Sequence, residues 1–504
     1  MRGDPLVTRA MPHGAALVIG GGIAGMRAAI DLADAGVQVH LIERTPTLGG
    51  KMDYLDTTFP TQNCTLCRST SAHGVGCPRP SIAPYFLEHL QRPEIHVHTL
   101  TELVALDGEA GAFTATVRHH PRYVDVGRCT ACGDCRAACP VELPDDYNAG
   151  LTRRRAIDRP SPQAIPRAYV LSPTPTCTTC RRCVEVCPTQ AIDLSQQPRD
   201  EALAVGAVIV ATGYRVHNAD EDAELGHGRY ANVLTGLELE RLLSGPGPTC
   251  GSLRRPSDGR EPRRVAFLQC VGSRDQKHAY CSSVCCMYAL KEAMLVKDRI
   301  PAAQCEIFLM DMRTFNKGHI ETLERAQGSY GVALTHCRIS GLKEDPASRD
   351  VLVRYVGEDG ALHEKPFDLV VLSTGLDPAA GAAGLFTRLG IEANPHGFCA
   401  VDRLAPWHTS RPGIYACGAA VEPQDIPESV TQASAAAAEV AQALRSGRPV
   451  TPPAPQPPAP ERDVAGEPPR IGVFVCHCGA EIDATLDVAR LMQVAQGMDG
   501  VIYA

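Results

Sequence analysis

Two runs of four cysteines with the same spacing restrict the middle of this chain more than any other feature. Each run has the form Cys-x2-Cys-x2-Cys-x3-Cys-Pro, and the runs cover residues 129–140 and 177–188. Thiolates at this spacing bind [4Fe–4S] clusters of the bacterial ferredoxin type, and the fourth cysteine of each run ligates the cluster of the other run. Two complete copies disfavour a zinc site or unused thiols. The first cluster is therefore assigned to Cys129, Cys132, Cys135 and Cys187, and the second to Cys177, Cys180, Cys183 and Cys139.

A glycine-rich loop near the N-terminus predicts a dinucleotide-binding βαβ unit. Residues 15–19 indicate a buried strand, GGGIAG follows at 20–25, and apolar residues then recur at helical spacing as far as Gly36. A second strand is expected over 37–42, ending at Glu43. In this context Gly20 permits the tight turn, Gly22 leaves room for the pyrophosphate, and Gly25 lets the helix pack on the strand. The strand before the loop and the helix after it disfavour an unrelated glycine turn. The expected dinucleotide contacts are Gly20, Gly22, Ile23, Ala24, Gly25 and Glu43.

Later motifs indicate that the dinucleotide is FAD. Gly49-Gly50-Lys51 follows Glu43, Thr-Gly pairs follow apolar strands at 212–213 and 374–375, and GIYACG at 413–418 precedes an Ala-rich helix expected over about 428–444. This order resembles the thioredoxin-reductase-like flavoprotein reductases, an α/β class with two dinucleotide-binding domains. The resemblance implies that the late glycine and the next helix N-terminus lie against the flavin, where the helix dipole stabilises negative charge. It also implies FAD contacts at Gly49, Gly50, Lys51, Thr212, Gly213 and Gly418.

The chain departs from those reductases at two places. Ala419 stands where they usually have an acidic residue directly after the late glycine. The apolar strand at 265–268 runs into QCVGS at 269–273, where a second glycine fingerprint would bind NAD(P)H. We therefore expect a group other than a nicotinamide to exchange electrons with the flavin.

A third group of cysteines follows that strand. Cys270, Cys281, Cys285 and Cys286 can ligate a cluster, but the adjacent pair is not a standard spacing. From spacing alone, buried helical cysteines or a redox disulfide are equally open. Weaker candidates for metal or redox chemistry lie near both ends of the chain, at Cys64, Cys67, Cys77, Cys476 and Cys478.

Length and composition limit the remaining possibilities. A chain of 504 residues predicts two or three domains, and a net charge of −8 disfavours a general nucleic-acid binder. No run of 18 apolar residues is present, and residues 1–14 lack the apolar core of a signal peptide, so a cytoplasmic protein without a membrane span is expected. In such a protein, 22 cysteines indicate metal or redox chemistry more than disulfides.

Taken together, the motifs resemble those of the heterodisulfide reductase A-subunit family, a family of iron–sulfur flavoproteins. The resemblance covers residues 15–444 and includes GGGIAG, FPTQNCTLC, PRYVD, QAIPRAYV, FLQCVGSRD, YCSSVCC and CGAAVEPQDIPESVTQASAAAA. The tail segment IGVFVCHCG is also similar to this family, but there it usually opens the chain. We therefore expect either a tandem arrangement that is cut short or a truncated reading frame.

The family resemblance implies properties that spacing alone does not give. Its FAD is thought to split electron pairs between two acceptors, which is electron bifurcation, and the third cysteine group holds an unusual cluster near the flavin. Lys291, five residues after Cys286, is then a candidate to lie beside the flavin and tune its potential, although a surface lysine is the simpler interpretation. The expected partners are a disulfide-reducing subunit, ferredoxin, and a hydrogenase or formate dehydrogenase module.

Two other functions remain as alternatives. One is an NAD(P)H oxidoreductase of the glutamate synthase small-subunit type, which the absent second glycine fingerprint disfavours. The other is an electron-conducting scaffold without flavin. The expected domains are residues 1–128, the first part of the FAD domain; 129–195, an inserted two-cluster ferredoxin domain; 196–445, the rest of the dinucleotide domains; 446–470, a Pro-rich linker; and 471–504, a partial C-terminal domain with a CHCG motif.

Overall fold

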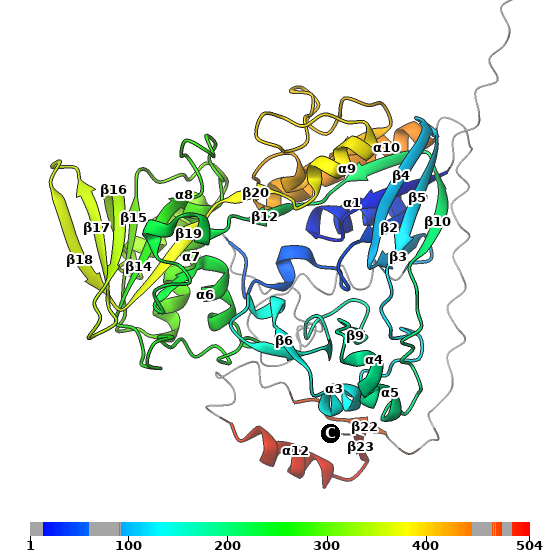
Figure 1. Ribbon diagram of the computed structural model, residues 1–504, viewed down its shortest axis with the longest axis horizontal. Coiled ribbons are helices and arrows are strands. Elements are labelled where there is room, and N and C mark those ends of the chain that lie inside the picture. The colour runs from blue at the N-terminus through cyan, green and yellow to red at the C-terminus, as the bar shows by residue number, and fades with distance from the viewer. Residues whose placement is uncertain are drawn as a thin grey trace, which may run out of the picture.

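A parallel five-stranded sheet forms the first unit of the fold (Figure 1). The computed structural model describes residues 14–59, 90, 92–445, 466, 468, 470–475 and 486–503, so Cys64, Cys67, Cys77, Cys476 and Cys478 lie outside the described residues. The sheet order is β21-β11-β1-β2-β3. Its strands are β1 (Ala15–Ile19), β2 (Gln38–Glu43), β3 (Ile95–Thr99), β11 (Ala207–Val210) and β21 (Ile414–Ala416).

The two faces of this sheet are covered by different elements because successive strand side chains point to opposite sides. Ala16 and Val18 pack with helices α1 (Ile23–Asp34) and α10 (Ile426–Arg445). Leu17 and Ile19 pack on the other face, against a second sheet of order β10-β5-β4 and against α9 (Ala382–Leu389). The strands of that antiparallel sheet are β4 (Thr101–Glu109), β5 (Ala112–His119) and β10 (Arg199–Val205).

One expected strand is in fact two. The apolar run 204–211 divides at Gly206, whose N–H donates to the carbonyl of Ala15 and whose carbonyl accepts from Gly111. β10 ends before this glycine in the antiparallel sheet, and β11 begins after it in the parallel sheet. The run is continuously apolar because β11 is buried on both faces and the end of β10 lies against the same core.

The second unit is built on a seven-stranded sheet of order β13-β19-β14-β15-β16-β17-β18. The first five strands in this order pair in parallel, and β17 and β18 continue the sheet antiparallel. Helices α6 (Gly236–Leu243), α7 (Cys285–Arg299) and α8 (His319–Gly328) cover one face of it. The strands are β13 (Val233–Thr235), β14 (Arg264–Val271), β15 (Gln304–Leu309), β16 (Ala333–Glu344), β17 (Val351–Gly357), β18 (Leu362–Phe367) and β19 (Leu369–Thr374).

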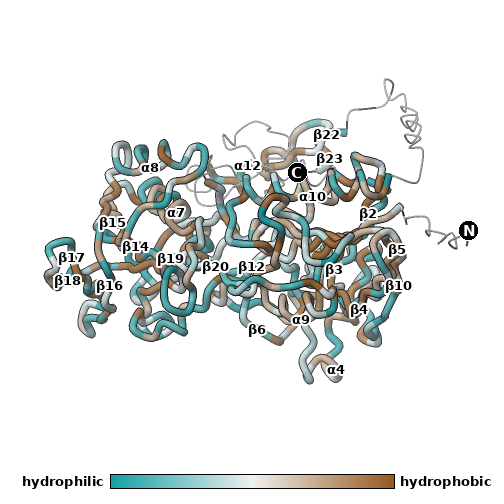
Figure 2. The backbone as a smooth tube through the Cα atoms, turned by 90° about the horizontal axis from the view of Figure 1, so that it is seen from above, coloured by the Kyte–Doolittle hydropathy of each residue, from teal (hydrophilic) through white to brown (hydrophobic). Residues whose placement is uncertain are grey.

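A short antiparallel ribbon connects the two units. It consists of β12 (Tyr214–Val216) paired with β20 (Leu376–Pro378), and in Figure 1 it lies between the two large sheets. Hydrophobic residues are concentrated in the strands and packed helices of both units, while the residues of peripheral loops are mainly hydrophilic (Figure 2). No helix among the described residues is long and apolar enough to cross a membrane.

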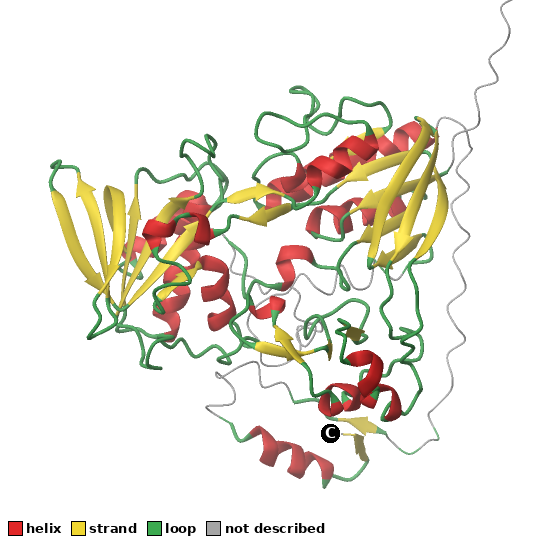
Figure 3. Cartoon of the chain, in the orientation of Figure 1, coloured by secondary structure: helices red, strands yellow, loops and turns green. Residues whose placement is uncertain are grey.

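The cysteine-rich insert connects two paired strands, β5 and β10. Its two ends lie side by side because His119 at the end of β5 pairs with Arg199 at the start of β10. The expected limits 129–195 fall inside this connection. Figure 3 shows it as short helices and strands joined by loops: α3 (Asp134–Ala138), β6 (Glu142–Pro144), β7 (Arg153–Arg155), β8 (Ile157–Asp158), β9 (Val170–Leu171), α4 (Cys177–Cys180) and α5 (Arg182–Glu185).

The C-terminal residues form a small separate element. β22 (Ile471–Gly472) pairs in parallel with β23 (Val501–Tyr503), and α12 (Val488–Gln496) lies between them in the sequence. Phe474 and Tyr503 are exposed, as expected of a segment too short to bury a core of its own.

Candidate functional site

A cavity of about 710 Å³ lies where the first unit, the second unit and the insert meet. Its walls include the glycine loop, Lys291 of α7 and Tyr147 of the insert. The carboxyl ends of β1 and β11 open onto it, which is where open α/β sheets bind dinucleotides. A volume of this size is in the range of small-molecule and cofactor sites.

Of the three fingerprint glycines Gly20, Gly22 and Gly25, only Gly22, which faces the cavity, has room for an added side chain among the described residues. A Cβ atom at Gly20, where φ is +112°, would lie 2.3 Å from the carbonyl oxygen of Ala211, and one at Gly25 would lie 1.8 Å from that of Gly20. A Cβ at Gly22 would meet nothing within 4 Å in the part of the chain that the structure describes. Two glycines are thus required by the fold itself, and Gly22 faces a space that a pyrophosphate can fill.

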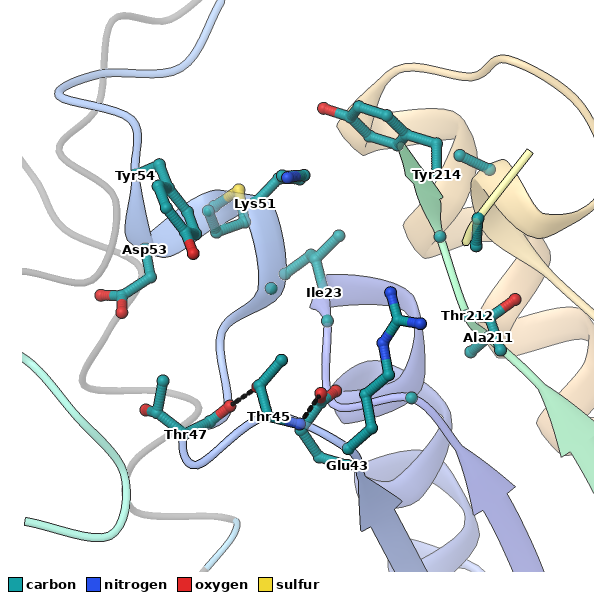
Figure 4. Close-up of a pocket in the computed structure, with 18 of the residues that line it drawn as sticks. Ile23, Glu43, Thr45, Thr47, Lys51, Asp53, Tyr54, Ala211, Thr212 and Tyr214 are labelled. Carbon is teal, nitrogen blue, oxygen red and sulfur yellow. Dashed lines mark hydrogen bonds between the residues drawn. The ribbon is translucent and has the colours of Figure 1, made fainter. Parts of the chain in front are cut away.

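Polar groups around this space fit a dinucleotide. The Glu43 carboxylate is buried and accepts hydrogen bonds from the N–H groups of Gly21 and Thr45, each at 2.7 Å (Figure 4). These bonds fix its position at the cavity wall and leave lone pairs that can accept from ribose hydroxyls. The buried hydroxyl oxygen of Thr212, also on the wall, has no hydrogen-bond partner among the described residues. Such an orphan atom is satisfied when a ligand supplies the partner.

Nine of the expected FAD residues line the cavity and three do not. Gly25, Gly49 and Gly418 lie behind its wall. The N–H of Gly418 donates to the side chain of Gln432 at 2.7 Å, and a Cβ there would lie 2.9 Å from that of Ala24, so this glycine serves close packing. The residues on the wall are Gly20, Gly22, Ile23, Ala24, Glu43, Gly50, Lys51, Thr212 and Gly213.

Lysines contribute positive charge to two parts of the cavity. Lys51 lies over the ring of Tyr54 at 5.2 Å, and burial, followed by the charge of Arg44, lowers its pKa (Figure 4). Lys291 is only 1% exposed, so the interpretation as a surface lysine is wrong. It forms an ion pair with Glu240.

The buried charges around Lys291 form a small network. Its ammonium donates to the carbonyl of Thr57 at 3.0 Å as well as to Glu240. Burial, and then repulsion by Glu240, raises the pKa of the neighbouring Glu292 well above its usual range. The cavity therefore has a fixed cation on its α7 side, held by a carboxylate and a carbonyl.

The insert supplies wall residues that sequence reasoning missed. Tyr147 packs against Tyr54, with ring centroids 5.8 Å apart, and the guanidinium of Arg241 lies 4.1 Å from the Tyr147 ring centroid. Arg159 and Leu171 also line the cavity. No local pattern marks these residues, because they reach the cavity only through the way the insert folds back.

The third cysteine group occupies the position that a nicotinamide pyrophosphate would take. Cys270 is near the carboxyl end of β14, and Cys285 and Cys286 begin α7, the next helix in the chain. Burial, and then the charges of Cys286, Cys270 and Cys281, raise the pKa of the Cys285 thiol well above its usual range. In a dinucleotide-binding unit, the strand end and the following helix N-terminus hold the pyrophosphate.

This cysteine group shares a wall with the cavity. The Cys285 thiol lies 3.7 Å from the carbonyl oxygen of Thr374, which also accepts a hydrogen bond from the Tyr288 hydroxyl at 2.7 Å. Thr374, Tyr288 and Tyr214 all line the cavity. Burial and the nearby Cys285 raise the pKa of Tyr214 to about 12.

Cysteines of the two runs lie next to one another in the insert. Cys129, Cys132 and Cys135 of the first run surround a small cavity of about 20 Å³ with Cys187 of the second. The pKa of the Cys183 thiol is raised by burial and then by the charge of Cys139, the crossing residue of the first run. Backbone N–H groups point at two of the sulfurs: Ala191 lies 3.3 Å from Cys187, and Thr174 lies 3.4 Å from Cys177. Such N–H···S contacts favour thiolates and tune cluster potentials.

Comparison with known proteins agrees with this architecture. Residues 128–192 match the 4Fe-4S dicluster domain family, 16–55 match the FAD dependent oxidoreductase family, and 301–437 match the pyridine nucleotide-disulphide oxidoreductase family. An iron-sulfur A subunit of the CoB–CoM heterodisulfide reductase of Methanopyrus kandleri is 43% identical over 439 residues, covering 86% of this chain and 64% of the relative. The A subunit of the H2:CoB–CoM heterodisulfide,ferredoxin reductase of Methanothermobacter marburgensis is 40% identical over 433 residues, covering 84% and 63%.

The chain belongs to the heterodisulfide reductase A-subunit family. It spans just under two thirds of the length of these relatives. Among solved structures, thioredoxin reductase from T. acidophilum is similar at 14% identity and a TM-score of 0.45, covering 85% of this chain and 97% of that one. The expected fold class, a thioredoxin-reductase-like FAD fold with an inserted two-cluster ferredoxin domain, is confirmed.

Proposed function

We propose that this chain is an electron-transferring subunit of a heterodisulfide-reductase-like complex and that it works as an FAD-dependent oxidoreductase. In this proposal FAD occupies the 710 Å³ cavity, two [4Fe–4S] clusters occupy the insert, and a third is held by Cys270, Cys281, Cys285 and Cys286. When bound, FAD supplies the exchange between electron pairs and single electrons. The chain supplies positions, charges and exclusion of water.

The shared wall between the cavity and the third cysteine group is the observation that carries the proposal. Thr374 and Tyr288 face the cavity, and the thiol of Cys285 contacts the same Thr374 carbonyl. A cluster there would lie beside the flavin without blocking its cavity. A group at this place also removes the pyrophosphate site of a second dinucleotide, which favours this function over an NAD(P)H oxidoreductase.

Lys291 is proposed as the residue that tunes the flavin. Its cation is buried at the cavity wall and held by Glu240 and the carbonyl of Thr57. A fixed positive charge in a site of low dielectric stabilises negative charge that develops on a bound group. The residues proposed to hold the adenosine and pyrophosphate are Gly22, Glu43 and Thr212.

We also propose electron bifurcation at the flavin and the identity of the partner subunits. The name of one relative contains hydrogen, the CoB–CoM heterodisulfide and ferredoxin, and the name of a second contains formate as well. These names support a disulfide-reducing subunit, ferredoxin, and a hydrogenase or formate dehydrogenase module as partners. The disulfide substrate would then react on another subunit of the complex.

Anaerobic cofactor analysis of matched variants tests the core of the proposal. The wild-type chain is expected to hold about one FAD and about twelve irons, four for each cluster. Cys285→Ser should remove about four irons and one EPR signal of the reduced protein, while Cys250→Ser, at an exposed cysteine outside the group, should remove none. Unchanged iron in Cys285→Ser would refute the third cluster. Rapid bleaching of the flavin by NADPH alone would refute the electron path proposed here.

A further inference from the structure

Three ligand-type side chains converge beside the ribbon that joins the two units, outside the cavity and the cysteine groups. His217 follows β12, Asp377 is the middle residue of β20, and His278 lies in the loop between Cys270 and Cys281. One nitrogen or oxygen atom from each side chain lies within 4.8 Å of the others. They come from segments far apart in sequence, so no motif predicts their meeting.

Two atoms of this cluster make no hydrogen bond within the part of the chain that the structure describes. They are the buried Nδ1 of His217 and the buried Oδ1 of Asp377. His217 Nδ1 lies 3.5 Å from one oxygen of Asp377, and His278 Nε2 lies 3.6 Å from the other. Direct hydrogen bonds between such groups are near 2.9 Å. Two ligands bound at about 2.1 Å to one tetrahedral Zn²⁺ are about 3.4 Å apart, which is close to the separation of His278 Nε2 from Asp377 Oδ1. One ligand atom from each of the three residues lies within 4.8 Å of the others, so small side-chain movements bring all three to one ion.

The outward-facing nitrogen of each imidazole has a carboxylate partner. His217 Nε2 lies 2.9 Å from Asp222, and His278 Nδ1 lies 3.3 Å from Asp275. This carboxylate–histidine pairing fixes the tautomer and presents the other nitrogen as a lone-pair donor, as found behind metal-bound histidines. Arg215 similarly holds the Oδ2 oxygen of Asp377 at 2.9 Å and leaves Oδ1 unpaired.

The charges of the cluster favour a divalent cation. Asp222, Asp275 and Asp377 carry three negative charges, and Arg215 compensates only one of them. Arg215 compensates the buried Asp377, and the partly exposed Asp222 and Asp275 add negative charge around the three ligand residues. A divalent cation is attracted by this charge, and imidazole and carboxylate groups are ligands that Zn²⁺ accepts.

We propose that His217, His278 and Asp377 bind a divalent transition-metal ion of the Zn²⁺ class, with water as the fourth ligand. The ion would fasten the loop that carries Cys281 to the β12–β20 ribbon, and thus to the junction of the two units (Figure 1). His217 already packs tightly on the base of this loop, since a Cβ at Gly272 would lie 2.1 Å from the ring. The assigned role is positional, and the site is separate from the iron–sulfur and flavin sites.

Metal analysis of the full-length holoprotein tests the site without relying on activity. After incubation with Zn²⁺ and gel filtration, the wild type should retain about one zinc per chain, and X-ray absorption at the zinc edge should show nitrogen and oxygen neighbours near 2.0–2.1 Å. His278→Gln should lose this zinc, while iron and flavin stay unchanged. His396→Gln is the matched control, because this exposed histidine contacts Tyr280 nearby but is outside the cluster.

A second variant separates metal binding from loss of structure. Asp222→Asn removes only the carboxylate behind His217, so zinc affinity should fall about 10- to 100-fold in a folded protein. The proposal is overturned if the wild type retains no zinc, or if the zinc has sulfur neighbours near 2.3 Å, which would place it in a cysteine site. Full zinc retention by His278→Gln would also overturn it, since the residues would then form only a hydrogen-bonded network.

Discussion

Adding one methyl group at Gly22 is expected to abolish FAD binding without disturbing the fold. The backbone at this position has φ −78°, which any residue adopts, and the added Cβ would meet no atom of the described residues within 4 Å. The apoprotein should lose only about 1 kcal/mol, because glycine is a better helix N-cap than alanine. The methyl would occupy the space assigned to the pyrophosphate, and we expect at least about a 100-fold loss of FAD affinity, equivalent to about 2.7 kcal/mol.

Gly25→Ala is the matched comparison, because it adds the same methyl group three residues later. There the Cβ would lie 1.8 Å from the carbonyl oxygen of Gly20, so the helix and the loop must separate. Overpacking of this kind costs about 3 kcal/mol or more. This variant should therefore lose folding stability first and FAD as a consequence.

Two measurements distinguish the variants. Urea unfolding of the flavin-free proteins reports stability, and titration of the same proteins with FAD reports affinity, with iron per chain as the check on the insert. Gly22→Ala should unfold almost as the wild type does and fail to bind FAD. The assignment of the cavity is refuted if Gly22→Ala binds FAD with unchanged affinity, or if its stability falls as far as that of Gly25→Ala.

Three further predictions follow from buried charges and ligand geometry. Lys291→Met leaves Glu240 buried without its cation, so the free energy of unfolding should fall by about 3–5 kcal/mol. The reduction potential of the flavin should also become more negative. Adding Glu240→Gln to this variant should restore most of the stability, measured by urea unfolding. Glu238 is the main cause that raises the pKa of His227 to about 9, so this pair stabilises the fold fully below pH 6.5 and progressively less as the pH rises through 9. His227→Gln should flatten the melting temperature over this range, and an unchanged slope would contradict the pairing. Cys183→Ala should lose about four irons, measured against sulfide and flavin in the same sample.

The local motifs of this chain could be predicted because their chemistry is contained in short segments. The spacing of the cysteine runs already specifies which thiols approach one cluster, and the structure brings Cys187 to the first run as that rule requires. The strand, the glycine loop and the helix start of the first βαβ unit follow in the same way from residues 15–43. The glycine roles at Gly20 and Gly25 are set by contacts within this unit and its neighbouring strand.

Other features depended on contacts that no local pattern encodes. Gly418 has the sequence position of a flavin contact, but the close approach of Ala24 turns it into a packing residue behind the wall. Lys291 belongs to a helix whose exposure cannot be judged from spacing alone, and only its meeting with Glu240, 51 residues away, explains its burial. The apolar run at 204–211 hides a change of sheet at Gly206, because the end of β10 and the whole of β11 are both apolar.

The sequence by itself therefore determined the fold class, the ferredoxin-type insert and the FAD-type glycine loop, because each is marked by short motifs with a characteristic spacing. The tertiary structure alone decided which groups share the cavity wall. It placed Tyr147 of the insert and Lys291 of the second unit on one cavity, and His217 beside Asp377. Such meetings depend on how two sheets and an insert pack together, and packing of distant segments is set by shape and burial rather than by any periodic pattern.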